Sequence, residues 1–321
     1  MPELPEVETI RRQLEPAVIG RRITSASVLD ERWTRPEPPA SVERAIAGRR
    51  IESVGRRGKY LVVGLEGDRS LVMHLRMTGN LLLRPPTLAG EGDAALDLME
   101  ATRLGAPRLY ESHPEARHLR AVIRLDDGSE LWFTDARRFG QAVALDGAAL
   151  DAYLTARLGP EPLSGELTPE GLAELAAGRT APLKSFLLNQ TRIAGIGNIY
   201  ADEALWRAEL HPLSPAGSLK LEHCERLIEG IVAALEVALA NRGASIDDYR
   251  DARGERGTAQ DEFLVHTREG EPCRRCGEQI RRIVVSGRST YFCPGCQRRL
   301  RRRPRRRRGA HGRRPGGARA R

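Results

Sequence analysis

The sequence has few aromatic residues and no long apolar segment. Phe, Trp and Tyr make up 4% of the 321 residues, so aliphatic side chains must dominate any core. No apolar run is long enough to span a membrane, and the N-terminus lacks the basic-then-apolar pattern of a secretory signal. We therefore expect a cytoplasmic protein with no membrane partner. Its length leaves room for two or three domains.

Cysteine is also scarce, and its spacing indicates metal binding rather than disulfides. There are five cysteines, and four of them form two close pairs near the C-terminus. Cys273-x2-Cys276 and Cys293-x2-Cys296 are separated by sixteen residues, which is typical of tetrahedral zinc held by four thiolates. Such a site has no open coordination position, so we expect one structural Zn²⁺. The fifth cysteine, Cys224, is expected to be a buried helix residue.

The segment between the cysteine pairs predicts a β-hairpin. Two strand-like runs, Gln279–Val285 and Ser289–Phe292, flank a turn that carries Arg288. A module this small has no core of its own and would fold only with its metal. An arginine on a rigid tip favours contact with a nucleic-acid groove, and a solvent-exposed turn arginine is the alternative interpretation.

Acidic residues are missing from the C-terminal end of the chain. Residues 297–321 contain 13 arginines, so residues 1–296 carry −4 although the whole chain carries +9. This density of like charge predicts a disordered tail over residues 298–321. The tail either holds phosphates without sequence preference or is an unselected extension. Binding by the rest of the chain must therefore be argued from local groups.

The order of elements predicts an α+β chain of several domains. Apolar residues at three- and four-residue intervals from Leu4 to Val18 predict an N-terminal helix. Short strands then predict a β-sandwich domain over 1–140, at Ile23–Leu29, Arg50–Val54, Tyr60–Leu65, Ser70–Leu75, Leu119–Leu125 and Glu130–Thr134. Helical periodicity predicts a helical domain over 141–262, at Ala148–Arg157, Pro169–Ala177, Ala181–Asn189, Asn198–Glu209 and Ser218–Ala240. The zinc module is expected at 263–297, and residues 85–117 are expected to be a surface insertion.

The N-terminus carries a candidate nucleophile. A small residue at position 2 normally allows the initiator methionine to be removed, which would leave Pro2 with a secondary amine. An α-amino group titrates near pH ~8, so part of it is nucleophilic at neutral pH. Attack on an aldehyde-level carbon gives an iminium ion, an electron sink that drives eliminations, and Glu3 places an acid beside it. The alternative is that Pro2 is only a common residue after a start methionine.

Further segments suit an anionic partner. Arg56-Arg57-Gly58-Lys59-Tyr60 is a basic turn that opens a strand. Gly195-Ile196-Gly197-Asn198 lies between two predicted helices, where bare backbone N–H groups make an anion site, although an ordinary turn is the alternative. Met77 and the Arg137-Arg138-Phe139 run follow strands and are candidates for groove wedges, or else for core residues.

Together, and in this order, these segments resemble the formamidopyrimidine-DNA glycosylase family of bifunctional base-excision repair enzymes. The resemblance covers residue 1 to about residue 297 without the 85–117 insertion. It is carried by the Met-Pro-Glu-Leu-Pro-Glu-Val-Glu-Thr opening, by Ile196–Ala201, and by Gly270-Glu271-Pro272-Cys273. It implies a β-sandwich with a leading helix, a helix–two-turn–helix domain and a zinc-finger hairpin.

The resemblance also implies roles for single residues. Pro2 would attack C1′ of a damaged nucleoside, while Glu3 protonates the sugar ring oxygen. Lys59 would contact phosphate and assist β-elimination, and Arg288 would hold the phosphates around the lesion and serve the δ step. No metal or redox cofactor takes part in this chemistry. The partner would be damaged double-stranded DNA, with further DNA contacts at Met77, His118, Arg137, Phe139, Arg179 and Asn198. We expect a monomer, because one active site with both termini engaged needs no second subunit.

The chain departs from the family in the loop that caps the extruded base. Gly257–Phe263 stands where the family has an aromatic-containing loop, and Val265-His266-Thr267-Arg268 where it has Val-Tyr-Gly-Arg. The leading hypothesis is excision of oxidised purines, 8-oxoguanine and formamidopyrimidines. One alternative is an endonuclease VIII-type enzyme for oxidised pyrimidines, whose usual opening has Gly in place of Leu4. The other is a catalytically silent zinc-finger protein that binds nucleic acid, which has no need of a proline amine.

Overall fold

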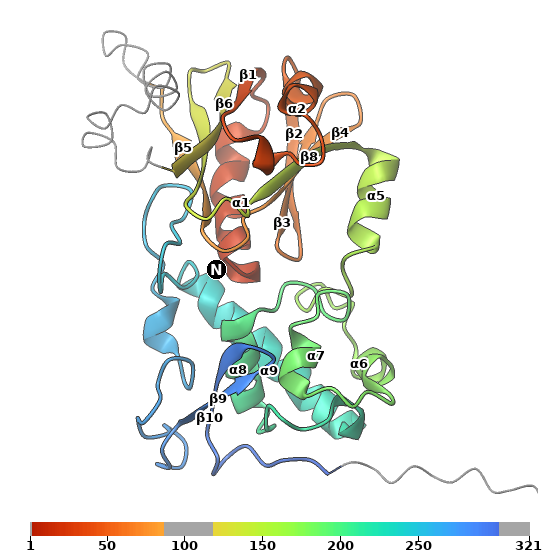
Figure 1. Cartoon of the computed structure of the whole chain (residues 1–321), viewed down its shortest axis with the longest axis vertical. Helices are drawn as coiled ribbons and strands as arrows, with labels where there is room; N and C mark the ends of the chain where they lie inside the picture. The colour runs from red at the N-terminus through yellow and green to blue at the C-terminus, as the bar shows by residue number, and fades with distance from the viewer. Residues whose placement is uncertain (1, 87–117, 302–321) are drawn as a thin grey trace, which may run out of the picture.

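Two antiparallel sheets form the upper lobe of the computed structural model, which describes residues 2–86 and 118–301 (Figure 1). One sheet has the strand order β1-β6-β7-β5 and the other β2-β3-β4-β8. The strands of the first are β1 (Ile23–Val28), β6 (Leu119–Leu125), β7 (Glu130–Asp135) and β5 (Gly79–Arg84). Those of the second are β2 (Ile51–Arg57), β3 (Tyr60–Leu65), β4 (Arg69–His74) and β8 (Gln141–Asp146). The predicted β-sandwich is confirmed.

The core of this lobe includes the face of helix α1 (Leu4–Val18) that carries Val7, Ile10 and Leu14. The helix begins with a capping box, because the Glu3 N–H donates to the Glu6 carboxylate at 2.7 Å. The 3₁₀ helix η1 (Glu31–Trp33) and helix α2 (Pro39–Ile46) add Trp33 and Ile46 to the same core. The predicted N-terminal helix is therefore present, and it is an integral part of the sandwich.

Four elements of the upper lobe were not predicted from the sequence: β5, β8, α2 and the 3₁₀ helix η1. β5 is buried along four consecutive residues, so it lacks the alternation that marks a half-exposed strand. β8 pairs with β4, so the second sheet includes residues that the sequence analysis placed in the helical domain. α2 has only eight residues. The predicted insertion at 85–117 and the predicted tail lie almost entirely outside the described residues.

The five predicted helices are present with shifted ends, four of them in the lower lobe and the first beside the upper lobe, against β4 and β8 (Figure 1). They are α5 (Gly147–Thr155), α6 (Pro169–Ala176), α7 (Leu183–Leu187), α8 (Asn198–Arg207) and α9 (Leu221–Ala240), with the 3₁₀ helices η3 (Ala216–Ser218) and η4 (Ala259–Glu262) between and after them. Leu4 lies in the core of the lower lobe, whereas Val7 lies in the core of the sandwich. Helix α1 therefore joins the two cores within one turn of the N-terminus.

A small hairpin of β9 (Arg281–Val285) and β10 (Arg288–Phe292) packs beside α8 (Figure 1). Its two turn residues, Ser286 and Gly287, have φ angles of 49° and 73°. Positive φ at both central positions is the type I′ pattern that matches the twist of a two-residue hairpin. The predicted hairpin is confirmed, and Arg288 is the first residue of β10, next to the turn.

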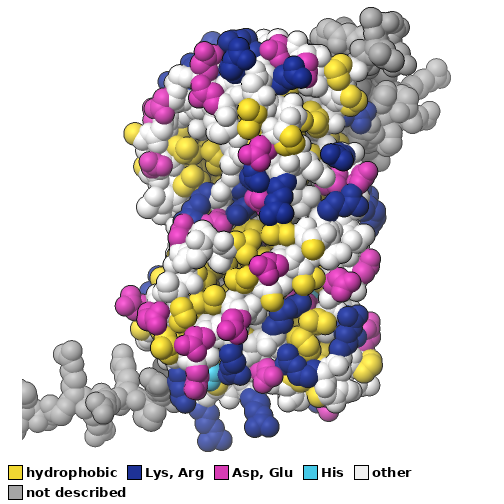
Figure 2. Space-filling model, turned by 180° about the vertical axis from the view of Figure 1, so that it is seen from behind, with side chains coloured by type: hydrophobic (Ala, Val, Ile, Leu, Met, Phe, Trp, Pro, Cys, Tyr) yellow, Lys and Arg dark blue, Asp and Glu magenta, His cyan; other side chains and the backbone are white. Residues whose placement is uncertain are grey.

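Charged side chains of both signs are mixed over the described surface. Seen from behind, Lys and Arg side chains lie among Asp and Glu side chains on both lobes, and hydrophobic side chains reach the surface across the middle (Figure 2). Among the residues described here, no helix combines the length and apolar character needed to cross a membrane. An anionic partner would therefore have to be recognised by local groups rather than by overall charge.

Candidate active site

The N-terminal residues lie on the loop that precedes helix α8. Pro2 is buried, and the Leu4 N–H donates to the Gly195 carbonyl at 3.1 Å. The Glu3 side chain is 1% exposed, and its Oε1 accepts from the Ile199 N–H at 3.1 Å, in the first turn of α8. Within the described residues its Oε2 has no hydrogen-bond partner. One carboxylate oxygen is thus held by a helix N-terminus, and the other remains available beside Pro2.

This close approach explains the two glycines before α8. A Cβ on Gly197 would lie 2.2 Å from Cδ of Glu3, inside the volume that the carboxylate occupies. A Cβ on Gly195, which has φ +87°, would lie 2.8 Å from Cβ of Leu4. Both positions need a bare backbone because α1 begins directly against the loop. The Gly-x-Gly pattern predicted from the sequence as an anion site is here the seat of the Glu3 carboxylate.

Lys59 is placed by the turn between β2 and β3. Arg57 pairs with Tyr60, so Gly58 and Lys59 form a two-residue turn with positive φ only at the glycine, as in a type II′ hairpin. The Lys59 side chain is 6% exposed, and no hydrogen bond from its Nζ is found in the described part of the chain. Burial lowers the pKa of Lys59, the nearby charges of Glu3 and Glu6 oppose this, and Arg288 adds to it. Lys59 is therefore a buried amine with a depressed pKa beside the Glu3 carboxyl.

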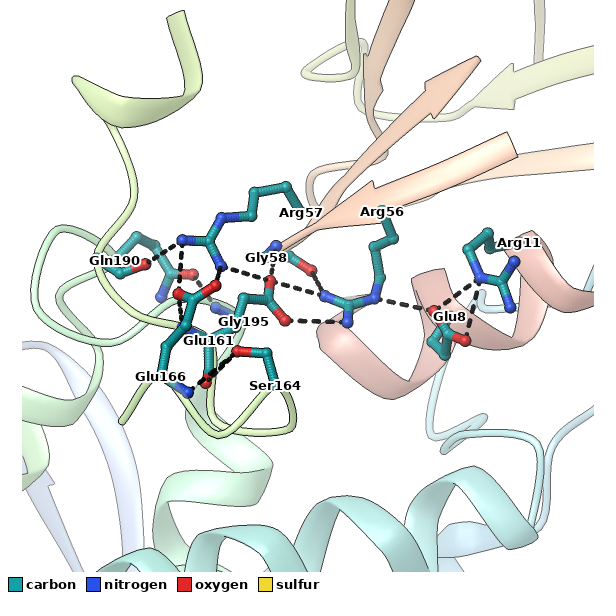
Figure 3. A network of polar contacts seen from close by, with 11 residues as sticks. Glu8, Arg11, Arg56, Arg57, Gly58, Glu161, Ser164, Glu166, Gln190 and Gly195 are labelled. Atoms are coloured by element: carbon teal, nitrogen blue, oxygen red, sulfur yellow. Dashed lines mark hydrogen bonds and ion pairs between the residues drawn. The ribbon is translucent and has the colours of Figure 1, made fainter. Parts of the chain in front are cut away.

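A buried ion pair holds this turn in place (Figure 3). Glu161, from the segment between α5 and α6, accepts from the Gly58 N–H and binds Arg56 through both carboxylate oxygens, at 2.9 and 3.0 Å. Arg56 also reaches Glu8 of α1 at 3.1 Å. The side chains of Arg56 and Glu161 are 9% and 6% exposed. The network ties the Lys59 turn both to helix α1 and to the segment between α5 and α6, and it was not predicted from the sequence.

Glu6 is a second buried carboxyl next to Glu3. It accepts from the Tyr200 hydroxyl at 2.5 Å and from the Ala244 N–H at 2.8 Å, in addition to the Glu3 N–H. Burial and the charge of Glu3 raise the pKa of Glu6, while the hydrogen bonds from Tyr200 and Ala244 lower it. With both oxygens engaged by protein donors, Glu6 anchors α1 to α8 and to the segment after α9.

Asn198 and the β9–β10 hairpin close the site from below. Asn198 Nδ2 donates to the Ser289 carbonyl at 3.0 Å, and its Oδ1 is buried without a partner among the described residues. The hydroxyls of Ser185 and Ser286 lie 2.7 Å apart, which brings α7 to the turn beside Arg288. Arg288 is exposed, and its charge acts on the pKa of Lys59. Residues far apart in the sequence thus converge here: Pro2, Glu3, Lys59, Asn198 and Arg288.

The two predicted wedge segments lie together on the upper lobe. Asp135, at the end of β7, accepts from the Thr78 hydroxyl in the Met77 loop and from the Arg137 N–H at 3.1 Å. Phe139 is 51% exposed, and the Arg137 guanidinium lies 4.9 Å from its ring centroid. One carboxylate therefore joins both loops. Sequence reasoning missed Asp135 because nothing in its neighbourhood marks it as a link between loops 57 residues apart.

His118 and Arg179 lie outside this cluster. His118 is half-buried before β6 and lines a cavity of about 560 Å³ with Thr78, Asn80 and Arg250, so it neighbours the wedge loops. Arg179 is exposed between α6 and α7, and its carbonyl accepts from the Gly217 N–H at 2.9 Å. The structure does not bring Arg179 to Glu3 or Lys59.

His74 is a candidate that sequence reasoning missed, although it lies in the same run as Met77. It lines a pocket of about 270 Å³ with Tyr60, Arg76 and Arg157, on the sheet that carries Lys59. Its Nδ1 accepts from the Arg76 N–H at 2.9 Å, which leaves Nε2 to donate. Burial and the charges of Arg76 and Lys59 lower the pKa of His74 to about 3, so the imidazole is neutral.

The four paired cysteines fit a tetrahedral metal ion. Their sulfur atoms all lie within 4.8 Å of one another, and Cys273 Sγ is 3.8 Å from Cys296 Sγ. A tetrahedron with Zn–S bonds of about 2.3 Å has edges of about 3.8 Å. The indole N–H of Trp206 also donates to Cys273 Sγ at 3.4 Å, a contact suited to a thiolate. The donor set and spacing agree with one structural zinc that braces the hairpin of Arg288.

The sequence matches three described protein regions in chain order. Residues 1–142 match "Formamidopyrimidine-DNA glycosylase N-terminal domain", and residues 158–250 match "Formamidopyrimidine-DNA glycosylase H2TH domain". Residues 270–299 match "Zinc finger found in FPG and IleRS". The third match contains all four clustered cysteines and Arg288.

Curated relatives and solved structures agree with these matches. The chain is 46% identical over 299 residues to the formamidopyrimidine-DNA glycosylase of Chloroflexus aurantiacus, covering 92% of this chain and 98% of the relative. It is 44% identical over 305 residues to that of Roseiflexus sp. RS-1, covering 93% of this chain and 100% of the relative.

A Lactococcus lactis FPG mutant in complex with Fapy-dG-containing DNA superposes with a TM-score of 0.78 at 32% identity, covering 93% of this chain and 100% of that one. MutM in complex with DNA containing carbocyclic 8-oxo-G gives a TM-score of 0.78 at 33% identity, with the same coverage.

Proposed function

This chain belongs to the formamidopyrimidine-DNA glycosylase family, and we propose that it excises oxidised purines from duplex DNA and cuts the strand through a covalent intermediate on Pro2. The observation that carries the proposal is the Glu3 carboxyl. One of its oxygens is held by the Ile199 N–H, the other has no partner in the described chain, and the buried Lys59 amine lies near it. The Glu3 carboxyl and the Lys59 amine thus lie near the N-terminal Pro2.

In the proposed reaction the Pro2 nitrogen attacks C1′ of the damaged nucleoside. The bond from C1′ to the base breaks, and the base leaves with the bonding electron pair and takes up the proton that the Pro2 nitrogen loses. Glu3 protonates the ring oxygen O4′, so the C1′–O4′ bond opens and the nitrogen lone pair forms an iminium ion with C1′. The positive charge of the iminium then stabilises the carbanion character that develops at C2′.

Strand cutting follows from this electron sink. Loss of the C2′ proton expels the 3′ phosphate, and a second elimination expels the 5′ phosphate. A Lys59 with a depressed pKa exchanges protons near neutral pH more readily than an exposed lysine, which suits it to assist the first elimination. Arg288, on the zinc-braced hairpin, and Asn198 are placed to hold the phosphates that leave. The zinc takes no part in these steps.

The damaged nucleotide must leave the base stack before Pro2 can reach C1′ of its sugar, at a cost of a few kcal/mol. We assign the space it vacates to Met77, Arg137 and Phe139, because their loops are joined by Asp135 and because Phe139 is exposed. His74 and Arg76 add a donor and a cation beside these loops, suited to a backbone phosphate. His118 is a further DNA contact near the wedge, and Arg179 is a peripheral one.

We further propose that the enzyme acts as a monomer in the cytoplasm, at the chromosomal DNA that contains its substrate. One set of groups from a single chain completes the site, so no second copy is needed for the chemistry. We propose that the chain is divided into the four predicted regions, 1–140, 141–262, 263–297 and 298–321. Strand β8 belongs with the first of these, because it pairs with β4.

Borohydride trapping tests the proposal. The protein is mixed with duplexes that contain 8-oxoguanine, formamidopyrimidine, thymine glycol or a preformed abasic site, and the mixtures are reduced. We expect a covalent adduct at Pro2, faster cleavage of the two purine lesions, and no adduct when a residue is retained before Pro2. Duplex binding without any adduct would identify a silent DNA-binding protein, and faster cleavage of thymine glycol would identify the pyrimidine-type enzyme.

A further inference from the structure

A fully buried lysine contacts the first turn of α8, next to the active site. Lys184, from α7, has a side chain with 0% exposure. Its Nζ donates to the Asn198 carbonyl at 2.8 Å and to Asp202 Oδ1 at 2.5 Å. The steps proposed above make no use of this ammonium. Its position is informative because Asn198 and Ile199, in the same turn, hold Ser289 and Glu3.

Buried and charged surroundings act on the pKa of Lys184 in opposite senses. Burial lowers its pKa, the charges of Asp202 and Glu3 oppose this, and Arg288 adds to it. Asp202 is itself fully buried and spends its other oxygen, Oδ2, on His266 Nδ1 at 2.8 Å. Lys184, Asp202 and His266 therefore form a linear chain of three buried polar groups.

His266 connects this chain to the zinc finger. It belongs to the segment 264–266, whose three backbone N–H groups donate to the Glu203 carboxylate at 2.9 to 3.1 Å. Its ring contacts Tyr291 of β10 edge to face, with centroids 5.0 Å apart. The chain of contacts thus runs from the hairpin of Arg288 to the helix turn that seats Glu3.

Stability alone is a weak reason for such an arrangement. Burying an ion pair costs desolvation that the Coulomb attraction often does not repay, so well-packed apolar residues of similar volume are commonly as stable. The arrangement does fix geometry: the Lys184 ammonium donates to the Asn198 carbonyl, and His266 holds the Asp202 carboxylate to which Lys184 also donates. A shift of about 1 Å in a group that positions catalytic atoms can lower a rate by roughly 100-fold.

We propose that Asp202 and His266 are positioning residues for the reaction, which hold the Lys184 ammonium against the Asn198 carbonyl and so keep the first turn of α8 in register with Glu3. This inference rests on the proposed function, because it assigns these residues to the site at which Glu3 acts. It concerns neither DNA contact nor metal binding, since all three side chains are buried away from solvent.

The test compares two variants of one position. An Asn side chain can place an N–H donor close to the position of histidine Nδ1, whereas a Leu side chain of similar size has no donor. His266→Asn should keep the single-turnover cleavage rate on preformed abasic DNA within about threefold of wild type. His266→Leu should lower it roughly tenfold at saturating enzyme. The dissociation constant for a tetrahydrofuran duplex should change less than about twofold in both, and zinc content should stay at one per chain.

A second arm uses the pH profile, which a merely structural role would not move. The charges that act on Lys184 are those of Asp202, Glu3 and Arg288. Removing the negative charge in Asp202→Asn lowers the pKa of Lys184 further, so the alkaline limb of the cleavage profile should move to lower pH. The double variant Lys184→Met/Asp202→Asn buries no unpaired charge and keeps the test available if Asp202→Asn does not fold. It should be slow, like His266→Leu.

The outcomes separate the two proposals. Absence of an adduct with the wild-type protein would refute the proposed function. If wild type is active, a wild-type rate in His266→Leu or in the double variant, or an unmoved alkaline limb in folded Asp202→Asn, would overturn the positioning role. A lower melting temperature with unchanged single-turnover rates would also overturn it, because that result assigns the chain of polar groups to stability alone.

Discussion

Glu161 offers a direct test of how the Lys59 turn is held. Both of its oxygens accept from N–H donors: Oε1 from Gly58 and Arg56, and Oε2 from Arg56. In Glu161→Gln one of these positions becomes an NH₂ group that faces a donor, and the negative charge beside Arg56 is lost. The substitution keeps the volume of the side chain, so its effect reports on hydrogen bonding and charge rather than on packing.

The magnitude follows from burial. Removing one partner of a buried pair typically costs about 3–5 kcal/mol, because the remaining charge is left uncompensated. Arg56 would retain Glu8 at 3.1 Å and the Gly58 carbonyl at 2.9 Å, so part of its charge stays balanced. We therefore expect Glu161→Gln to lower the free energy of unfolding by about 2–3 kcal/mol. A freed Gly58–Lys59 turn should also slow β-elimination roughly tenfold.

Glu166→Gln is the matched control. Glu166 is 48% exposed and pairs with Arg57 at 3.0 Å in the same network (Figure 3). Because solvent screens this pair, its loss should change the free energy of unfolding by less than about 1 kcal/mol and leave the elimination rate unchanged. The measurements are denaturant unfolding of the zinc-loaded protein and single-turnover cleavage of preformed abasic DNA.

Equal stability losses in Glu161→Gln and Glu166→Gln would contradict the argument from burial. A less stable Glu161→Gln protein that still cleaves at the wild-type rate would contradict the claim that Glu161 positions Lys59. The effect on stability should also persist at high salt, since a buried pair is screened far less than an exposed one. A loss that disappears in salt would place the network at the surface in solution.

Three further predictions test other parts of the site. Gly197→Ala places a Cβ 2.2 Å from Cδ of Glu3, so the rate of base excision should fall roughly 100-fold while duplex binding is retained. Gly55→Ala is the control: the nearest atom to its Cβ is 3.8 Å away, so the excision rate should not change. His74 has a pKa of about 3 in the folded protein and 6.5 in the unfolded one, so its neutral form stabilises the fold above pH 6.5 and loses this effect as the pH falls towards 3. Between pH 6.5 and 4.5 the free energy of unfolding should therefore fall by about 2–3 kcal/mol less in His74→Gln than in wild type, as measured by unfolding at each pH. Removing zinc with a chelator should abolish strand cleavage and expose the backbone of the hairpin to hydrogen exchange while the sandwich stays protected; cleavage by zinc-free protein would contradict this.

The sequence predicted those parts of the molecule that depend on neighbours in the chain. The spacing of Val7, Ile10 and Leu14 was sufficient for α1, and the two cysteine pairs were sufficient for the metal site and its hairpin. β5 was missed because it is buried along consecutive residues, which removes the alternating pattern. The contacts that hold the site could not be found this way, because Glu161 and Arg56 are 105 residues apart and only the folded chain brings them together.

The charge distribution shows how a body with a formal charge of −4 can bind an anionic polymer. Cations that hold the fold are paired with carboxylates, as Arg56 is with Glu8 and Glu161. In the described residues, three arginines around the site have no carboxylate partner: Arg76 donates to the Gln141 amide, Arg137 lies over the Phe139 ring, and Arg288 is exposed. An arginine that is already paired gains little by meeting a phosphate, because it must first lose its carboxylate. Unpaired arginines displace counterions from DNA directly, so affinity comes from the few side chains at the site rather than from net charge.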